Sequence, residues 1–315
     1  EMYVFQMFHR AGLPIPYHDL CHFISPRTVH TGTAILQLSG YGKRFVDEQY
    51  GRDGSVFNMD TTYEPDTTVD GGVESAKLPV PHQAHIGTDF TDLGDKEQYR
   101  SPFDIRSGNR RDDYDGLMRL CRVMALPQAA FDAQVGTVLD VDQALRMTAL
   151  EILCGIGDTY ISASPSLPHN LRLITFPDGA PAQLLAWDMD FTFAAGTGSS
   201  IFLHPGVNLA KLLNHAQTRR LYLHHIHDLC QTAFNTDYLD PWLDHYGRMA
   251  GQDFSAASSY VANRRAFALT QLPAPVPFAI TSNGGLDFSA PTNVIALSGS
   301  GWLDVRSIRV NGIPA

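Results

Sequence analysis

Residues 155–193 have the sequence GIGDTYISASPSLPHNLRLITFPDGAPAQLLAWDMDFTF, and this stretch predicts a β-hairpin flanked by acidic residues. Two apolar runs, 171–176 and 183–187, are separated by a Pro-Asp-Gly turn. An Asp-Gly pair between two such runs is a strong hairpin signal. Asn170 opens the first run and Asp188 closes the second. Side chains at strand ends can leave the core and face a cleft, so both residues are candidates for a functional site.

A helix that ends shortly before Asp158 is predicted upstream of the hairpin. Apolar residues recur at helical spacing from Asp140, a candidate N-cap, to Gly155, and Asp190 lies two residues after Asp188. Phosphoryl transfer requires an Asp–Asn–Asp set: one carboxylate orients the attacking hydroxyl, while an Asn and a second Asp hold Mg²⁺. On spacing alone, an Asp at a strand end is more often a turn former than a catalytic residue.

The rest of the chain predicts a mixture of helices and strands. Residues 60–113 are rich in Asp, Thr, Pro and Gly, which predicts a long, partly ordered insertion with a polar surface. Three prolines between 273 and 277 predict a stiff linker, and 278–315 alternates like a β domain with a turn at 283–285. Apolar spacing predicts helices over 2–11, 43–50, 112–127, 240–250 and 258–269, and strands over 20–24, 33–38 and 56–59. Residues 208–234 are predicted to form one long helix or two short ones.

Composition narrows the classes of function. The 315 residues carry a net charge of −10, which argues against a broad surface for nucleic acid or anionic membranes. The longest apolar stretches are shorter than the roughly 18 residues that span a bilayer. The four cysteines are far apart and form no CxxC pair, so a zinc ribbon is not supported, whereas free thiols and two disulfides both stay open. The apolar start and the β-like end predict a piece of a longer chain.

Several segments together resemble the spore-coat protein H (CotH) kinase family. That family has a Gly-Asn-x-Asp segment, then an Asn-Tyr strand, then Trp-Asp-x-Asp before a Thr-Phe; the corresponding segments here are 155–158, 169–173 and 185–193. The resemblance extends to other segments. Residues 2–16 resemble the family's helix that ends in Gly-x-Pro, and 45–51 resemble the helix before its Gly-x-Leu-Tyr-Lys segment, which corresponds to 54–58. Residues 139–142 resemble its Asp-rich entry to a long helix, and 245–269 resemble its closing helices.

The resemblance implies an α+β, atypical protein-kinase-like domain over 1–272, with a mostly helical C-lobe, short hairpins and its first strands missing. The Pro-rich linker 273–277 and a partial, immunoglobulin-like β domain over 278–315 would follow. It also implies a secreted, cell-surface or coat-associated enzyme that transfers the ATP γ-phosphate to Ser or Thr of a protein, for which a Ser-rich segment is one candidate acceptor. ATP and Mg²⁺, or another divalent metal, are the implied cofactors.

By motif, Asp158 would be the catalytic carboxylate and Asp188 the metal ligand. Asn170 would assist the metal, and Asp190 would be a second ligand or structural. The loop between Asp158 and Asn170 is longer than is usual in the family, because Ser162 and the four residues after it are inserted.

Three departures from the family pattern favour an alternative, a catalytically impaired pseudokinase that serves as a structural or binding module of a large secreted protein. The glycine-containing strands and the phosphate-contacting Lys and Arg would lie before residue 1. Ser39 stands where the family often has Glu, and Asn58 stands where it has Lys. Arg172 could substitute for the missing cation. None of the lysines lies obviously at the predicted site; they are Lys43, Lys77, Lys96 and Lys211.

Other readings of the same residues are open. Residues 188–192 also fit the DxDxT motif of a phosphatase whose first Asp attacks phosphorus, but that motif should end the first strand of a doubly wound fold. His224 and Asp228 lie one helical turn apart and could bind a transition metal, although a polar helix surface is the simpler interpretation. His169 could contact a phosphate, and Trp187 is either a core aromatic or a nucleotide-stacking residue.

Overall fold

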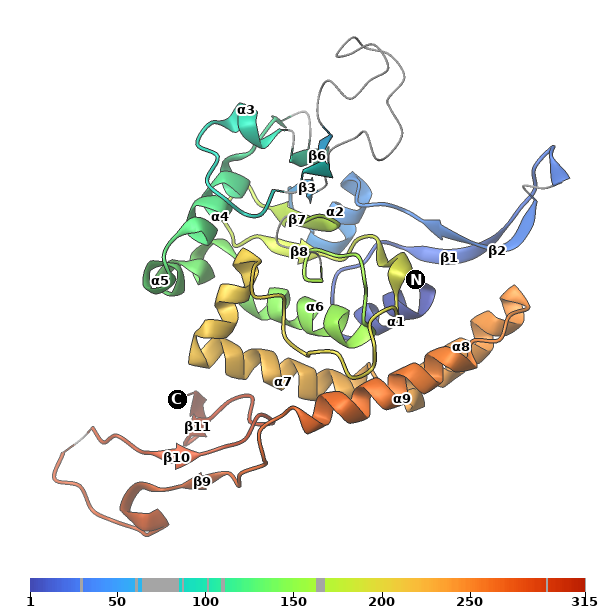
Figure 1. The fold of residues 1–315 in the computed structure, drawn as a ribbon. Helices are drawn as coiled ribbons and strands as arrows, with labels where there is room; N and C mark the ends of the chain where they lie inside the picture. The colour runs from blue at the N-terminus through green and yellow to red at the C-terminus, as the bar shows by residue number, and fades with distance from the viewer. Residues whose placement is uncertain are drawn as a thin grey trace.

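A four-stranded antiparallel sheet lies at the centre of the computed structural model (Figure 1). Its strand order is β6-β3-β7-β8. The strands are β3 (Ser55–Met59), β6 (Phe103–Ser107), β7 (Leu171–Thr175) and β8 (Gln183–Leu185). The structure describes residues 1–28, 31–59, 62–63, 85–86, 88–100, 102–108, 111–162, 168–292 and 294–314.

The register of the sheet places residues far apart in sequence beside one another. Arg172 of β7 pairs with Asn58 of β3 on one side and with Leu185 of β8 on the other. The predicted hairpin is therefore confirmed, with its turn between β7 and β8. The sequence predicted a partly ordered insertion over 60–113, but β6 lies within that range and forms part of the central sheet. It pairs with β3, which is buried along its whole length and needs a partner on each side.

Helices pack below the sheet in the view of Figure 1, and α6 (Val141–Cys154) lies nearest to it. The predicted N-cap is confirmed, because the Asp140 side chain accepts a hydrogen bond from the Gln143 N–H. α6 packs on α7 (Ala216–Thr232), and α9 (Ser255–Thr270) contacts both helices. The remaining large helices are α4 (Asp115–Ala125), α5 (Gln128–Val138) and α8 (Thr236–Ala250). The sequence prediction missed α5, whose apolar face is weakly defined.

The N-terminal part lies beside this helical body. α1 (Met2–Arg10) buries most of its residues against α6 and α8, and the strands β1 (His18–Phe23) and β2 (Gly32–Leu38) form a projecting hairpin. α2 (Lys43–Tyr50) has the predicted bounds. Phe45 and Val46 of α2 join Tyr41 in a second, smaller core against the sheet.

Shorter elements connect these parts. β4 (Thr62–Tyr63) pairs with β5 (His85–Ile86), and most of the predicted insertion between them lies outside the described residues. The other short elements are α3 (Lys96–Tyr99) and the 3₁₀ helices η3 (Met189–Phe191) and η4 (Asn208–Asn214).

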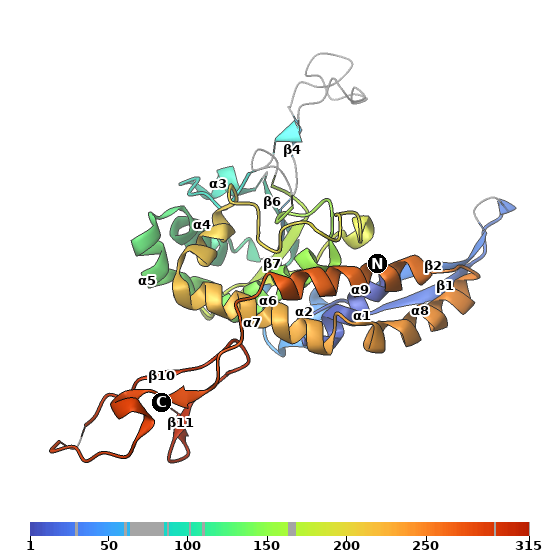
Figure 2. The same ribbon diagram turned by 60° about the horizontal axis from the view of Figure 1, so that its bottom comes forward.

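Residues 278–292 and 294–314 form little regular structure, and the part that contains β9 (Ala279–Ile280) and β10 (Gly299–Ser300) projects away from the helical body (Figure 2). β9 pairs with β10, and β11 (Arg309–Val310) pairs with β12 (Ile313–Pro314). The turn predicted at 283–285 is confirmed as η5 (Ser282–Gly285). The immunoglobulin-like domain stays a prediction.

The structure also tests the expectations for the cysteines and for the α7 histidines. All four cysteines are free thiols, and Cys121, Cys154 and Cys230 are buried. The interpretation of the α7 histidines as a polar surface is wrong for His224 and His225, which are both buried.

Among the described residues, no helix is long and apolar enough to cross a membrane.

Candidate functional site

The site is built at one end of the β7–β8 hairpin. β7 starts at Leu171 and β8 ends at Leu185, so antiparallel pairing brings Asn170 and Asp188, which flank these strands, to the same end of the sheet. Asn170 has φ 53° and Asp188 has φ 57°. Non-glycine residues rarely adopt this left-handed conformation, and such residues cluster at functional sites.

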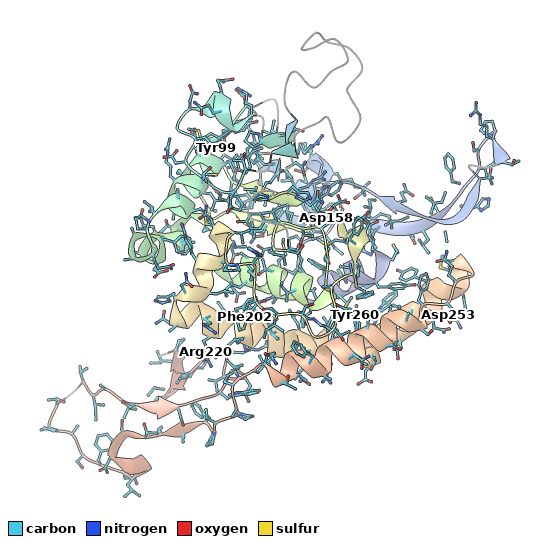
Figure 3. The ribbon with its side chains drawn as sticks, in the orientation of Figure 1. Tyr99, Asp158, Phe202, Arg220, Asp253 and Tyr260 are labelled. Carbon is cyan, nitrogen blue, oxygen red and sulfur yellow. The ribbon has the colours of Figure 1, made fainter. Side chains whose placement is uncertain are left out.

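The end of α6 delivers Asp158 to the same neighbourhood (Figure 3). Gly155 ends the helix with φ 57°, a conformation that glycine adopts without steric cost. The turn after it pairs with the chain beyond Asp188: the Gly157 N–H donates to the Phe191 carbonyl at 3.0 Å, and the Phe193 N–H donates to the Cys154 carbonyl at 2.8 Å. These bonds fix the segment before Asp158 against the segment after Asp188.

The side chain of Asp158 has two polar neighbours at the start of β7. His169 Nε2 lies 2.9 Å from Asp158 Oδ1. Asn170 Nδ2 donates to the Asp158 backbone carbonyl at 2.8 Å and lies 3.5 Å from Asp158 Oδ2. The carboxylate remains 47% exposed, whereas the His169 side chain is 12% exposed, so Asp158 is held by its partners and still open to a second molecule. The contact of His169 is with a carboxylate, which the sequence analysis did not anticipate.

A buried arginine lies next to this group on β7. The Arg172 guanidinium stacks on the Trp187 ring, 3.2 Å from its centroid, and Arg172 Nε donates to Asn58 Oδ1 at 3.2 Å. The Tyr41 ring lies 5.2 Å from the same guanidinium, and the Tyr41 hydroxyl donates to the Ala186 carbonyl. The cation that Trp187 contacts is therefore Arg172. The same arginine lies beside Asn58, the residue that stands where the resemblance expects a lysine.

The two aspartates after β8 differ in exposure. Asp188 is half-buried, whereas Asp190 is exposed in η3. Burial raises the pKa of the Glu1 carboxyl group, and the charges of Asp190 and Asp188 raise it further. In the part of the chain that the structure describes, no group of three His, Cys, Asp or Glu side chains could hold a metal ion. A cation here would depend on the carboxylates of Asp188 and Asp190 with the Asn170 amide oxygen.

Arg264 of α9 is a residue that the sequence analysis did not assign to the site. Its side chain is 1% exposed and donates to four backbone carbonyls, those of Ile152, Thr197, Ser199 and Ser200. It therefore ties the last turn of α6 to the loop that follows η3. The sequence around Arg264 contains no signal for this role, because only the fold brings the four carbonyls together.

The lysines of the described chain are engaged elsewhere. Lys43 pairs with Asp47, and Lys96 pairs with Asp112. Lys211 donates to the carbonyls of Met124 and Leu126 at the end of α4, and Lys77 lies outside the described residues. The DxDxT motif also lies after β8, an edge strand of an antiparallel sheet, and not after the first strand of a doubly wound fold.

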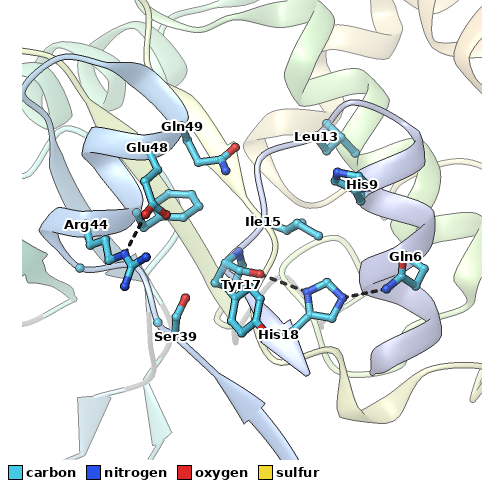
Figure 4. A pocket seen from close by; sticks show the side chains of 14 residues that line it. Gln6, His9, Leu13, Ile15, Tyr17, His18, Ser39, Arg44, Glu48 and Gln49 are labelled. Atoms are coloured by element: carbon cyan, nitrogen blue, oxygen red, sulfur yellow. Dashed lines mark hydrogen bonds and ion pairs between the residues drawn. The ribbon is translucent and has the colours of Figure 1, made fainter. Parts of the chain in front are cut away.

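A cavity of about 560 Å³ lies away from these residues, between α1, the start of β1 and α2 (Figure 4). Gln6 and His18 form part of one wall, and the ion pair of Arg44 with Glu48 forms part of the other. The His18 ring also bonds to the Pro16 carbonyl at 3.1 Å, and burial lowers its pKa. Some of the polar groups in the walls are thus already paired with one another, and Leu13, Ile15 and Phe45 add apolar surface.

Comparison with known proteins assigns the chain to a family. The model of the CotH kinase proteins matches residues 5–263, which is most of the sequence. The chain belongs to the CotH kinase family. A curated relative is the inner spore coat protein H of Bacillus subtilis (strain 168), which is 21% identical over 146 residues. That match covers 44% of this chain and 38% of the relative, so it spans less than half the length of either protein.

Proposed function

We propose that this protein is an atypical protein kinase that transfers the ATP γ-phosphate to a Ser or Thr hydroxyl of a protein, with Asp158 as the catalytic carboxylate. One observation carries the proposal: Asp158 is held by His169 and Asn170, and its side chain is nevertheless 47% exposed. A general base must be oriented and must also reach the hydroxyl from which it takes the proton. Family membership supports the same chemistry.

The chemistry of the neighbouring donors fits a bound Mg²⁺. Carboxylate and amide oxygens are hard ligands, and Mg²⁺ commonly binds through one or two carboxylates together with substrate phosphates. Asn170 uses its amide nitrogen as a donor to Asp158, so its oxygen is the amide atom that could contact a cation. Asp188 and Asn170 would hold the metal, with exposed Asp190 as a further ligand. The metal would neutralise charge on the phosphates during transfer.

The residues of this chain would divide the remaining work. Asp158 accepts the proton of the acceptor hydroxyl as the hydroxyl oxygen forms its bond to the γ-phosphorus and the bond to the ADP oxygen breaks. Asn170 holds the backbone of Asp158 through its 2.8 Å bond to the carbonyl. Arg172, beside Asn58, is the candidate cation for the phosphates.

Phosphate transfer from radiolabelled ATP to a Ser-rich protein tests the proposal with the full chain. Asp158→Asn keeps the size of the side chain and removes its basicity, so transfer should fall by at least about 100-fold. Asp178→Asn is the matched control, since Asp178 is exposed in the turn at the opposite end of the same hairpin. It should stay within about 2-fold of wild type, as surface substitutions usually do. Equal labelling by wild type and Asp158→Asn would refute the assignment.

The metal assignment has its own test. Asp188→Asn should weaken Mg²⁺-dependent ADP binding, measured by calorimetry, by about 10-fold or more, because one charged ligand is lost. Asp190→Asn should have a smaller effect, because Asp190 is exposed. ADP binding that is indifferent to Mg²⁺ in wild type would contradict the metal site.

A pseudokinase is the second candidate, and Asn58 favours it. Asn58 is 2% exposed and stands where the resemblance expects a lysine. Transfer needs cationic groups to offset charge that develops on the phosphates. ATP binding without transfer by wild type, under conditions in which a known kinase labels the same acceptor, would favour a binding module.

The relative's name, inner spore coat protein H, supports a coat or surface setting for this chain as well. A secreted or surface protein would meet its acceptor outside the cell, and a surface or coat protein is the acceptor that we propose. Fractionation of the source cells, with antibodies to the protein, tests the location.

A further inference from the structure

His169 and Asn170 are consecutive in sequence, yet both side chains contact Asp158. In an extended strand, neighbouring side chains point to opposite faces. The left-handed backbone of Asn170, with φ 53°, breaks that alternation immediately before β7 begins. Non-glycine residues rarely adopt this conformation, although asparagine does so more readily than most. The entry to β7 is thus shaped so that two side chains converge on one aspartate.

The chemistry of the contact between His169 and Asp158 determines which of the two residues donates the hydrogen bond. An ionised carboxylate only accepts hydrogen bonds, so the 2.9 Å contact requires His169 Nε2 to carry a hydrogen and donate it to Asp158 Oδ1. Charge-assisted bonds of this kind are roughly twice as strong as neutral ones. One carboxylate oxygen is therefore engaged, and rotation of the carboxylate about its terminal bond is restrained.

The other oxygen, Oδ2, lies 3.5 Å from Asn170 Nδ2, which is the outer limit for a hydrogen bond. The side chain of Asp158 is also much more exposed than that of His169. Oδ2 is consequently the oxygen that can accept a proton from a second molecule. His169 lies behind the carboxylate, in a position to orient it without meeting that molecule.

We propose that His169 is a positioning residue for phosphoryl transfer: its Nε2–H holds Asp158 Oδ1 so that Oδ2 faces the acceptor hydroxyl. The inference rests on the proposed function of Asp158. The hydroxyl proton moves to Oδ2 as the new oxygen–phosphorus bond forms and ADP leaves. His169 keeps its Nε2 hydrogen throughout, and it neither gives nor takes a proton.

Two substitutions separate orientation from simple packing. His169→Gln keeps an N–H donor at similar reach, whereas His169→Leu keeps comparable bulk without a donor. For the Leu variant, we expect kcat to fall about 10- to 100-fold with the KM for ATP within about 3-fold, since a misplaced base slows the chemical step. The Gln variant should stay within about 3-fold of wild type. Equal losses in both variants, or no loss in the Leu variant, would overturn the proposal.

A measurement without turnover tests the hydrogen bond itself. In ¹⁵N NMR spectra of the full chain, the resonance missing from His169→Gln identifies His169, and its shifts report which ring nitrogen carries the hydrogen. Wild type should show the Nε2–H form, and Asp158→Ala should shift the balance toward the other form. The Nδ1–H form in wild type would overturn the inference. If wild type shows the Nε2–H form but transfers no phosphate, the proposed function fails while the contact stands, so the two failures are distinguishable.

Discussion

The end of α6 and the C-terminal segment 278–314 differ in how firmly side chains and backbone hold them. At the end of α6, the turn 155–157 pairs with the loop 191–194 through backbone hydrogen bonds. Arg264 then binds four carbonyls of α6 and the loop that follows. The end of α6 is thus held by hydrogen bonds to two distant parts of the chain, the loop after η3 and α9.

The C-terminal segment has few such partners. Its apolar side chains are largely exposed, for example Leu286 at 72% and Ile313 at 70%. It is attached to α7 mainly near Trp302, whose backbone carbonyl accepts from Arg220 at 2.6 Å, and through the ion pair of Arg306 with Asp228. Leu303 is the one apolar side chain of the segment that is fully buried among the described residues.

This difference shows where the fold can hold chemistry in place. A catalytic carboxylate must stay within a fraction of an ångström of its working position, which requires supporting contacts from several elements. Of the two regions compared, the one around Asp158 has them. Four predictions test the comparison.

Arg264→Met should produce the largest effect on stability, about 3–5 kcal/mol, because it removes a buried guanidinium that donates to four backbone carbonyls. Urea unfolding followed by circular dichroism measures it. Arg265→Met is the matched control, since Arg265 is partly exposed and donates mainly to the Cys230 carbonyl. A loss below about 1 kcal/mol in the Arg264 variant would show that the loop does not depend on this side chain.

Gly155→Ala should destabilise the protein by about 2–4 kcal/mol. An alanine Cβ would lie 2.0 Å from the Tyr260 hydroxyl oxygen, and φ 57° adds strain for any residue with a side chain. Tyr260→Phe removes that oxygen, which is buried without a hydrogen-bond partner, and should recover at least about 1 kcal/mol in the double variant. Thermal unfolding of both single variants and the double variant gives the coupling, and strict additivity would contradict this contact.

Glu151 should make stability depend on pH. It is a fully buried carboxyl group on α6, and burial raises its pKa from 4.5 to about 8. Between these values the folded protein keeps the proton that the unfolded chain loses, so stability should fall by up to about 1.4 kcal/mol per pH unit as the pH rises, and then level off. Glu151→Gln removes this slope. Parallel pH profiles for the two proteins would contradict the assignment.

Leu286→Ser, in the C-terminal segment, should change stability by less than about 0.5 kcal/mol, because the side chain is 72% exposed. Leu303→Ser in the same segment is a contrasting variant, since Leu303 is 4% exposed. A larger loss for Leu286 than for Leu303 would mean that the exposed residues of the segment are covered in solution.

Much of the fold was predictable from local signals. The hairpin followed from its Asp-Gly turn and two apolar runs, and the start of α6 followed from Asp140 as its cap. β6 was missed because its five residues form a strand only through pairing with β3. α5 was missed because it has little apolar periodicity, and tertiary packing decides such helices.

The site was partly predictable for a similar reason. Residue type and strand position singled out Asp158, Asn170 and Asp188, and their roles stay predictions. The contact of His169 with Asp158 was not predicted, because it depends on the left-handed backbone of Asn170. The spacing of residues along the sequence does not predict the left-handed conformation of Asn170.

The sequence by itself determined the class of fold, the hairpin, the family and the acidic residues that carry the proposed chemistry, because these depend on local periodicity and on motifs. The tertiary structure alone decided that His169 donates to Asp158, that Arg172 lies beside Asn58, and that Arg264 binds the loop after η3. Each of these contacts joins groups whose distance is set by strand register or helix packing. Such distances follow from the free energy of the whole chain and not from any one segment.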